Sequence, residues 1–249
     1  MQEAKGTFFS STRIAAIALF SALSGILYVF GFPISVAFPG FLELNFSDIP
    51  ALIGTFALGP TSGAVIVALK VLIKLAIKGT TTAFVGDTAD LLIGLAFVLP
   101  AGLIYRRRRT FRGALVSLFV GTISSTAVAI FVNWLILIPF YLKFFFGGEW
   151  EPLLNFMTPL FPSCTKENFY AFYLWASCLP FNLMRCLIAV GVTLPVYKRI
   201  SRALDRLNEK IAPHGTEELP KRRILTYVLV GAAVLVVLTA LILLRHFVW

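Results

Sequence analysis

The feature that most constrains this chain is a succession of long apolar stretches separated by prolines, glycines and clusters of charge. Hydrophobic residues make up 58% of the 249 residues and charged residues only 14%, which is too apolar for a water-soluble domain. A hydrocarbon core about 30 Å thick requires roughly 20 residues of helix, and an open strand would leave its backbone groups unpaired there. We therefore expect an all-α integral membrane protein.

The apolar stretches predict seven helices, at about residues 13–31, 48–58, 62–78, 85–105, 113–143, 167–199 and 224–247. Gly59 and Pro60 separate the second helix from the third, which predicts a tight hairpin of two short helices. We expect a membrane domain at 1–200, a cytoplasmic linker at 201–223 and one extra C-terminal transmembrane helix at 224–249.

Basic residues cluster in a few segments, chiefly 106–112, 198–210 and 221–223, with Lys5 and Arg13 near the N-terminus. If the N-terminus is cytoplasmic and the helices alternate across the bilayer, all these segments lie in the cytoplasm, as the positive-inside rule requires. The net charge of +10 therefore indicates topology, not nucleic-acid binding, because no aromatic residues interleave with a basic patch. We expect a multi-pass protein of the cell membrane, in contact with lipid and without a nucleic-acid partner.

Polar side chains beside or within the apolar stretches cost on the order of a few kcal/mol each unless they find a partner or a wet cavity. Together with nearby aromatic residues they form the candidate substrate-binding set: Asn45, Phe46, Asp48, Asp87, Asp90, Asn133, Tyr141, Asn182 and Arg185. We expect the polar groups to converge in an outward-facing pocket walled by Phe46, Trp134 and Tyr141, which would suit a flat heteroaromatic solute.

Purely structural roles compete with binding at several of these positions. Asn182 and Arg185 share a helix face after Pro180, and a carboxylate, Asp87 or Asp90, could neutralise the arginine. The two aspartates could equally cap the N-terminus of their own helix.

The same alternatives apply to the helix expected at 48–58 and to its neighbour. Ser47 or Asp48 could cap the first of these helices. Lys70, Lys74 and Lys78 recur every four residues, and they could reach the membrane interface or pair with aspartates.

Motifs for catalysis are missing from the sequence. It contains no G-x-x-x-x-G-K-[ST], H-E-x-x-H or G-x-S-x-G pattern, and its two histidines, His214 and His246, lie in the expected linker and at the end of the chain. We therefore expect no enzyme, no bound metal and no cofactor. Two alternatives from other classes remain: an intramembrane enzyme with a metal on Asp87 and Asp90, and a proton-coupled carrier that uses them.

Four blocks in chain order carry a resemblance to a known family: LNFSDIPALIGTFALGPTSGAVIVALKVLIKL, GTTTAFVGDTADLLIGLAFVLPAGLIY, VNWLILIPFY and LPFNLMRCLIAV. Over about residues 10–200 the chain resembles the substrate-binding S-components of energy-coupling factor (ECF) transporters, most closely the riboflavin type. The resemblance implies a six-helix membrane protein that captures riboflavin from outside. A transmembrane coupling protein and two ATPase subunits would then drive uptake. Another vitamin or small solute is the alternative ligand.

The resemblance also implies roles for particular residues. Small residues in the first helix would dock on the coupling protein, and they are Ala15, Ala18 and Ala22. The positions of Asn45, Asn133, Asn182 and Arg185 correspond to flavin contacts. Two positions depart from the family pattern, since Arg185 stands where lysine is usual and Asp90 where an asparagine is usual.

Overall fold

The computed structural model describes residues 11–211. The expected helix at 224–247, and the part of the expected linker after residue 211, lie outside the described residues.

The first four helices form within a few residues of their expected bounds: α1 (Ser11–Val29), α2 (Asp48–Leu58), α3 (Pro60–Lys78) and α4 (Val85–Arg107). Gly59 separates α2 from α3 with a backbone φ of +92°, a conformation that glycine adopts readily, and Pro60 begins α3. The predicted tight hairpin is therefore confirmed, and α2 is short as expected. The expectation that both helices are short is wrong for α3, whose 19 residues are enough to cross a membrane.

Two longer helical runs contain segments with wider, π-helical turns. The first run is α5 (Phe111–Val132), a π-helical segment (Asn133–Leu137), α6 (Ile138–Phe140) and a second π-helical segment (Tyr141–Phe145). The second run is α8 (Phe169–Ala171), a π-helical segment (Phe172–Cys178) and α9 (Leu179–Ile211).

The π-helical segments lie next to prolines. Pro139 lies between the two in the first run, and Pro180 follows the one in the second. Proline has no N–H to donate into the preceding turn, so a local change in helical geometry is expected there. Asn133 and Tyr141 each begin such a segment.

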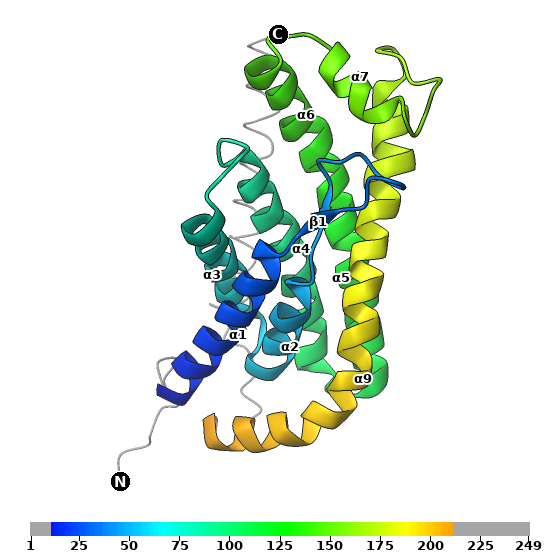
Figure 1. The fold of residues 1–249 in the computed structure, drawn as a ribbon. Coiled ribbons are helices and arrows are strands. Elements are labelled where there is room, and N and C mark those ends of the chain that lie inside the picture. Colours follow the sequence, from blue (N-terminus) through cyan, green and yellow to red (C-terminus); the bar gives the residue numbers. More distant parts are fainter. Residues whose placement is uncertain (1–10, 212–249) are drawn as a thin grey trace. The chain divides into compact units, whose positions relative to one another are not determined.

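The end of α9 differs from the prediction, because the helix continues to Ile211 and not to about residue 199. No strong helix breaker follows Pro195 until Pro213, so nothing in the sequence ends the helix earlier. Figure 1 shows the last part of α9 turning away from the axis of its first part, as a proline inside a helix permits.

The connecting segments contain three short elements that the sequence did not predict. Strands β1 (Phe32–Pro33) and β2 (Glu43–Leu44) pair antiparallel, with Phe32 opposite Leu44. Helix α7 (Glu151–Met157) lies between the two expected helices at 113–143 and 167–199. In Figure 1, α7 and the β1–β2 segment lie toward the same end of the bundle, near the beginning of the α8–α9 run.

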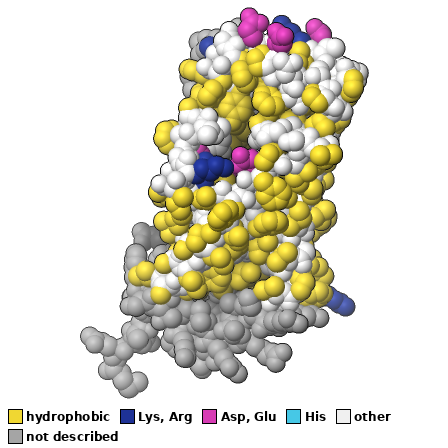
Figure 2. Space-filling view, in the orientation of Figure 1, with side chains coloured by type: hydrophobic (Ala, Val, Ile, Leu, Met, Phe, Trp, Pro, Cys, Tyr) yellow, Lys and Arg dark blue, Asp and Glu magenta, His cyan; other side chains and the backbone are white. Residues whose placement is uncertain are grey.

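Four described helical segments are long and apolar enough to cross a membrane: Pro60–Lys78, Val85–Arg107, Phe111–Phe145 and Phe169–Val196. Two shorter apolar helices, Arg13–Val29 and Asp48–Leu58, accompany them. Figure 2 shows the matching surface, where apolar side chains cover most of the visible described face. Acidic and basic side chains lie at its upper end and in a recess part-way down.

Helix α2 lies among four other helices and packs against α1, α3, α4 and α9. Ala51 and Leu52 are fully buried in its core. At the C-terminal end of α2, Arg13 from α1 donates from Nη2 to the carbonyl of Leu58 at 2.8 Å, which satisfies a carbonyl that the helix itself leaves unpaired.

Candidate functional site

A cavity of about 360 Å³ lies between the β1–β2 segment and the helices of the bundle. Its size falls in the range of small-molecule binding sites. The residues that line it come from α1, the β2 region, α3, the α3–α4 connection, α4, the end of the α5–α6 run, α7 and α9. Their polar members are Tyr28, Glu43, Asn45, Lys74, Lys78, Thr81, Thr82, Asp87, Asp90, Asn133, Tyr141, Asn182 and Arg185.

Residues 30–46, which connect α1 to α2, form one wall of the cavity. Phe41, Leu42 and Glu43 all line it. The Phe41 ring packs against the rings of Phe156 and Tyr173, with centroids 5.5 Å away in both cases. This wall therefore closes against α7 and the π-helical segment before α9 through aromatic contacts.

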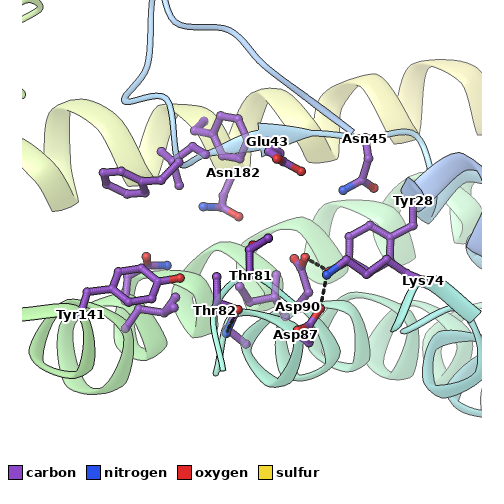
Figure 3. A pocket seen from close by; sticks show the side chains of 18 of the residues that line it. Tyr28, Glu43, Asn45, Lys74, Thr81, Thr82, Asp87, Asp90, Tyr141 and Asn182 are labelled. Carbon is purple, nitrogen blue, oxygen red and sulfur yellow. Dashed lines mark hydrogen bonds and ion pairs between the residues drawn. The ribbon is translucent and has the colours of Figure 1, made fainter. Parts of the chain in front are cut away.

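Two amide side chains point into the same space from opposite elements (Figure 3). Asn45 uses Oδ1 to accept hydrogen bonds from the backbone N–H and the hydroxyl of Ser47, at 3.2 and 2.6 Å. Asn182 donates from Nδ2 to the carbonyl of Cys178 at 2.8 Å. Among the described residues no hydrogen bond involves Nδ2 of Asn45 or Oδ1 of Asn182, so one donor group and one acceptor remain for a ligand.

Asn133 also lines the cavity, but its side chain is already engaged. It donates from Nδ2 to the carbonyl of Ala129 at 2.8 Å and accepts at Oδ1 from the Tyr173 hydroxyl at 2.5 Å. Both bonds hold the amide in one orientation at the start of a π-helical segment. Its remaining hydrogen and lone pair are what it can offer to a solute.

Asp48 lies just behind the cavity lining and joins three helices. Its Oδ1 accepts from Lys70 Nζ at 2.6 Å, and its Oδ2 accepts from Arg185 Nε at 2.8 Å. The Lys70 ammonium also donates to the hydroxyl of Ser47 at 2.9 Å. All four side chains are buried, so these bonds replace the water that the charged groups lose.

The other two aspartates are paired at the cavity surface. Asp90 accepts from Arg185 Nη1 at 3.0 Å and from the hydroxyl of Tyr28 (Figure 3 draws the second contact). Asp87 accepts from Lys74 Nζ at 2.5 Å, and its Oδ2 is buried without a partner among the described residues. The predicted pairing of Arg185 with Asp90 is therefore confirmed, whereas Asp87 pairs with a lysine.

The connection between α3 and α4 brings backbone and hydroxyl groups to the cavity. The hydroxyl of Thr80 accepts from the backbone N–H groups of Thr82 and Phe84, and the Thr82 hydroxyl accepts from that of Gly86. Phe84 has a φ of +66°, an unusual conformation for a bulky residue. These bonds hold Thr81 and Thr82 against the cavity.

Several sequence-based expectations need correction. Phe46 and Trp134 do not line the cavity; both are more than one third exposed. Asp48 supports the site from behind, and neither it nor Ser47 makes a side-chain cap at α2. Lys70 does not extend to the membrane interface. Its side chain is 1% exposed, and its ammonium group pairs with the buried carboxylate of Asp48.

Sequence reasoning did not select Tyr28, Glu43 or Phe41 as site residues. Glu43 carried a usable signal, since it is a carboxylate in an otherwise apolar segment. Tyr28 carried little signal for a binding role, because an aromatic residue near the end of an apolar helix is equally typical of a membrane interface.

Within the described residues no group of three or more His, Cys, Asp or Glu side chains is arranged to hold a metal ion. The carboxylates of Asp87 and Asp90 are engaged with Lys74, and with Arg185 and Tyr28. The cavity therefore offers selective polar contacts and aromatic surface, which suit binding.

Comparison with known proteins agrees with this geometry. Residues 12–197 match the family described as "ECF transporter, substrate-specific component". The chain belongs to this family. It is a transporter component and not an enzyme, and the family works with an ECF module.

Curated relatives of this substrate-specific component include the riboflavin transporter RibU of Staphylococcus aureus (strain TCH60). It is 27% identical over 195 residues, which cover 78% of this chain and 93% of the relative. The riboflavin transporter FmnP of Bacillus subtilis (strain 168) is 28% identical over 133 residues, 53% of this chain and 70% of the relative. A solved S component of a bacterial ECF transporter superposes with a TM-score of 0.57 at 26% identity, covering 77% of this chain and 96% of that one.

Proposed function

We propose that this substrate-specific component binds riboflavin from outside the cell and delivers it to a coupling protein and two ATPase subunits for uptake. The observation that carries the proposal is the cavity, in which Asn45 and Asn182 present an unused donor and an unused acceptor. The relatives named riboflavin transporters support the choice of ligand.

The chemistry of the cavity fits a flavin. An isoalloxazine ring is flat, aromatic and edged with carbonyl and N–H groups, and its ribityl chain carries hydroxyls. Tyr141, Phe145 and Phe156 offer aromatic surface, while the two amides offer polar partners. A solute that forms hydrogen bonds with both amides gains more binding free energy than one that displaces their water without replacing those bonds.

The finer architecture belongs to the same proposal. It comprises six helices in the binding domain, one further helix at 224–247, a cytoplasmic N-terminus and a cavity reached from outside. Ala15, Ala18 and Ala22 would form the contact with the coupling protein. All three are exposed on α1, and small residues at such spacing let another helix approach closely.

The alternatives from other classes have less support. A metal-dependent enzyme or a proton-coupled carrier would need Asp87 or Asp90 available for a metal or a proton. Both carboxylates instead hold basic partners in the bundle.

The test is a titration of purified, detergent-solubilised protein with riboflavin, followed by flavin fluorescence. We expect a saturable site in the wild type and binding weaker by about 1–3 kcal/mol in Asn182→Ala and in Asn45→Ala, because each leaves a ligand atom unpaired. Asn155→Ala is the matched control, since Asn155 is exposed and does not line the cavity. Unchanged affinity in both cavity variants would contradict the proposal.

A further inference from the structure

The ionisable side chains around the cavity balance one another. Its lining holds three cationic and three anionic side chains, namely Lys74, Lys78, Arg185, Glu43, Asp87 and Asp90. Lys70 and Asp48 lie behind them and add one of each sign. With all eight groups ionised, the site has no net charge.

Each cation of the lining also has a specific carboxylate partner. Lys74 Nζ lies 2.5 Å from Asp87 Oδ1, and Arg185 Nη1 lies 3.0 Å from Asp90 Oδ1. Lys78 pairs with Glu43 at 3.4 Å, and both are substantially exposed. A phosphate in any part of the cavity would therefore compete with a carboxylate that is already in place.

Asp90 determines what a solute meets at Arg185. The Asp90 side chain is 25% exposed, whereas the Arg185 side chain is 5% exposed. The remaining guanidinium nitrogen of Arg185, Nη2, is buried and has no partner in the described part of the chain. The carboxylate thus covers the guanidinium, and the surface that it presents to a ligand is anionic.

We infer that Asp90 makes this site selective for an uncharged ligand and against the phosphate ester of the same ligand. The inference rests on the proposed function, in which the two forms are riboflavin and riboflavin 5′-phosphate. The ester adds a charge of about −1.5 to −2 at neutral pH. Every cation that lines the site already has a carboxylate partner. The phosphate would therefore lose its hydration on binding without finding a cation free to pair with it.

The first measurement compares the wild-type affinities for riboflavin and riboflavin 5′-phosphate. We expect the phosphate to bind at least about tenfold more weakly. A neutral 5′-acyl ester of riboflavin separates charge from bulk, and we expect it to bind closer to riboflavin than the phosphate does. Equal affinity for riboflavin and its phosphate overturns the inference. The inference also fails if the neutral ester binds as weakly as the phosphate does.

The second measurement repeats the comparison in Asp90→Asn. Asparagine keeps the shape and can still accept from Tyr28, but it leaves part of the Arg185 charge uncompensated. We expect the ratio of the two affinities to narrow by about tenfold. Asp90→Glu, which keeps the charge, should retain most of the wild-type ratio.

A matched control is Glu43→Gln, which also removes one carboxylate from the lining. Glu43 is 47% exposed, so solvent screens its charge and the affinity ratio should change much less than in Asp90→Asn. An equal change in both variants would assign the effect to overall charge and overturn the role of Asp90.

The outcomes distinguish the two proposals. A wild-type protein that binds no flavin contradicts the proposed function together with this inference. A protein that binds riboflavin and its phosphate equally contradicts this inference alone. If Asp90→Asn loses riboflavin binding altogether, the wild-type comparison with the neutral ester still decides between charge and size.

Discussion

At the scale of single residues, Asp48 has the greatest structural consequence. One carboxylate neutralises Lys70 from α3 and Arg185 from α9, and all three side chains are almost completely buried. A buried ion pair is weak evidence of net stability, but removal of one partner leaves a charge with neither water nor counter-ion. Asp48 therefore supports the position of Arg185 at the cavity without touching a ligand itself.

We predict that Asp48→Asn lowers the free energy of unfolding by about 3–5 kcal/mol, because two buried cations lose their shared carboxylate. Denaturant titration in detergent micelles measures the change. Lys78→Gln breaks the exposed pair with Glu43 and should cost at most about 1 kcal/mol. If the two variants lost equal free energy of unfolding, the buried pairs of Asp48 would contribute no more to stability than the exposed pair of Lys78.

At the scale of helices, close approach between α4 and α5 sets the width of the bundle beneath the cavity. Gly121 of α5 is buried, and a Cβ atom there would lie 2.9 Å from both the carbonyl oxygen and a ring carbon of Phe97 in α4. The carbonyl is part of the backbone and cannot move away by changing a rotamer. Glycine is required at this position because the two helix backbones nearly touch.

Gly121→Ala should therefore lower stability by about 1–3 kcal/mol, since α4 and α5 must move apart to admit the methyl group. The matched control is Gly191→Ala in α9, where a Cβ would meet no atom within 4 Å. That substitution should be neutral, or stabilise by up to about 1 kcal/mol through the better helix propensity of alanine. Thermal unfolding of both variants in the same detergent checks the prediction, and equal melting temperatures would contradict it.

At the scale of the whole molecule, binding and coupling are expected to use different surfaces. The cavity lies among α1, α3, α4 and α9 under the β1–β2 segment, whereas Ala18 and Ala22 are exposed on α1 and are not among its lining residues. An S component that works with an ECF module needs both a ligand site and a docking face. The two functions should therefore separate on mutation.

We predict that Ala18→Leu or Ala22→Leu leaves riboflavin affinity unchanged and reduces ATP-driven uptake several-fold in vesicles that contain the complete transporter, because larger side chains keep a partner helix at a distance. Ala127→Leu on α5 adds the same bulk at another exposed position and serves as the control. Uptake at the wild-type rate in both α1 variants would exclude this face as the docking surface.

Sequence alone determined much of this protein, because a membrane imposes strong one-dimensional constraints. An apolar stretch that crosses a membrane must be helical, and helix breakers such as Gly59 and Pro60 mark where it ends. The first residues of α2, α3 and α4 were therefore predictable within about two positions. The high cost of polar groups in lipid also identified Asn45, Asn182, Arg185 and the aspartates as notable.

Only the tertiary structure decided which of these groups meet. Arg185 was expected to pair with Asp87 or Asp90. It pairs with Asp90 and also with Asp48, whereas Asp87 pairs with Lys74. Residue spacing specifies a shared face within one helix, but a pair between helices depends on their packing, rotation and depth, which no local pattern encodes. For the same reason Tyr28 joined the cavity, and Phe46 and Trp134 did not.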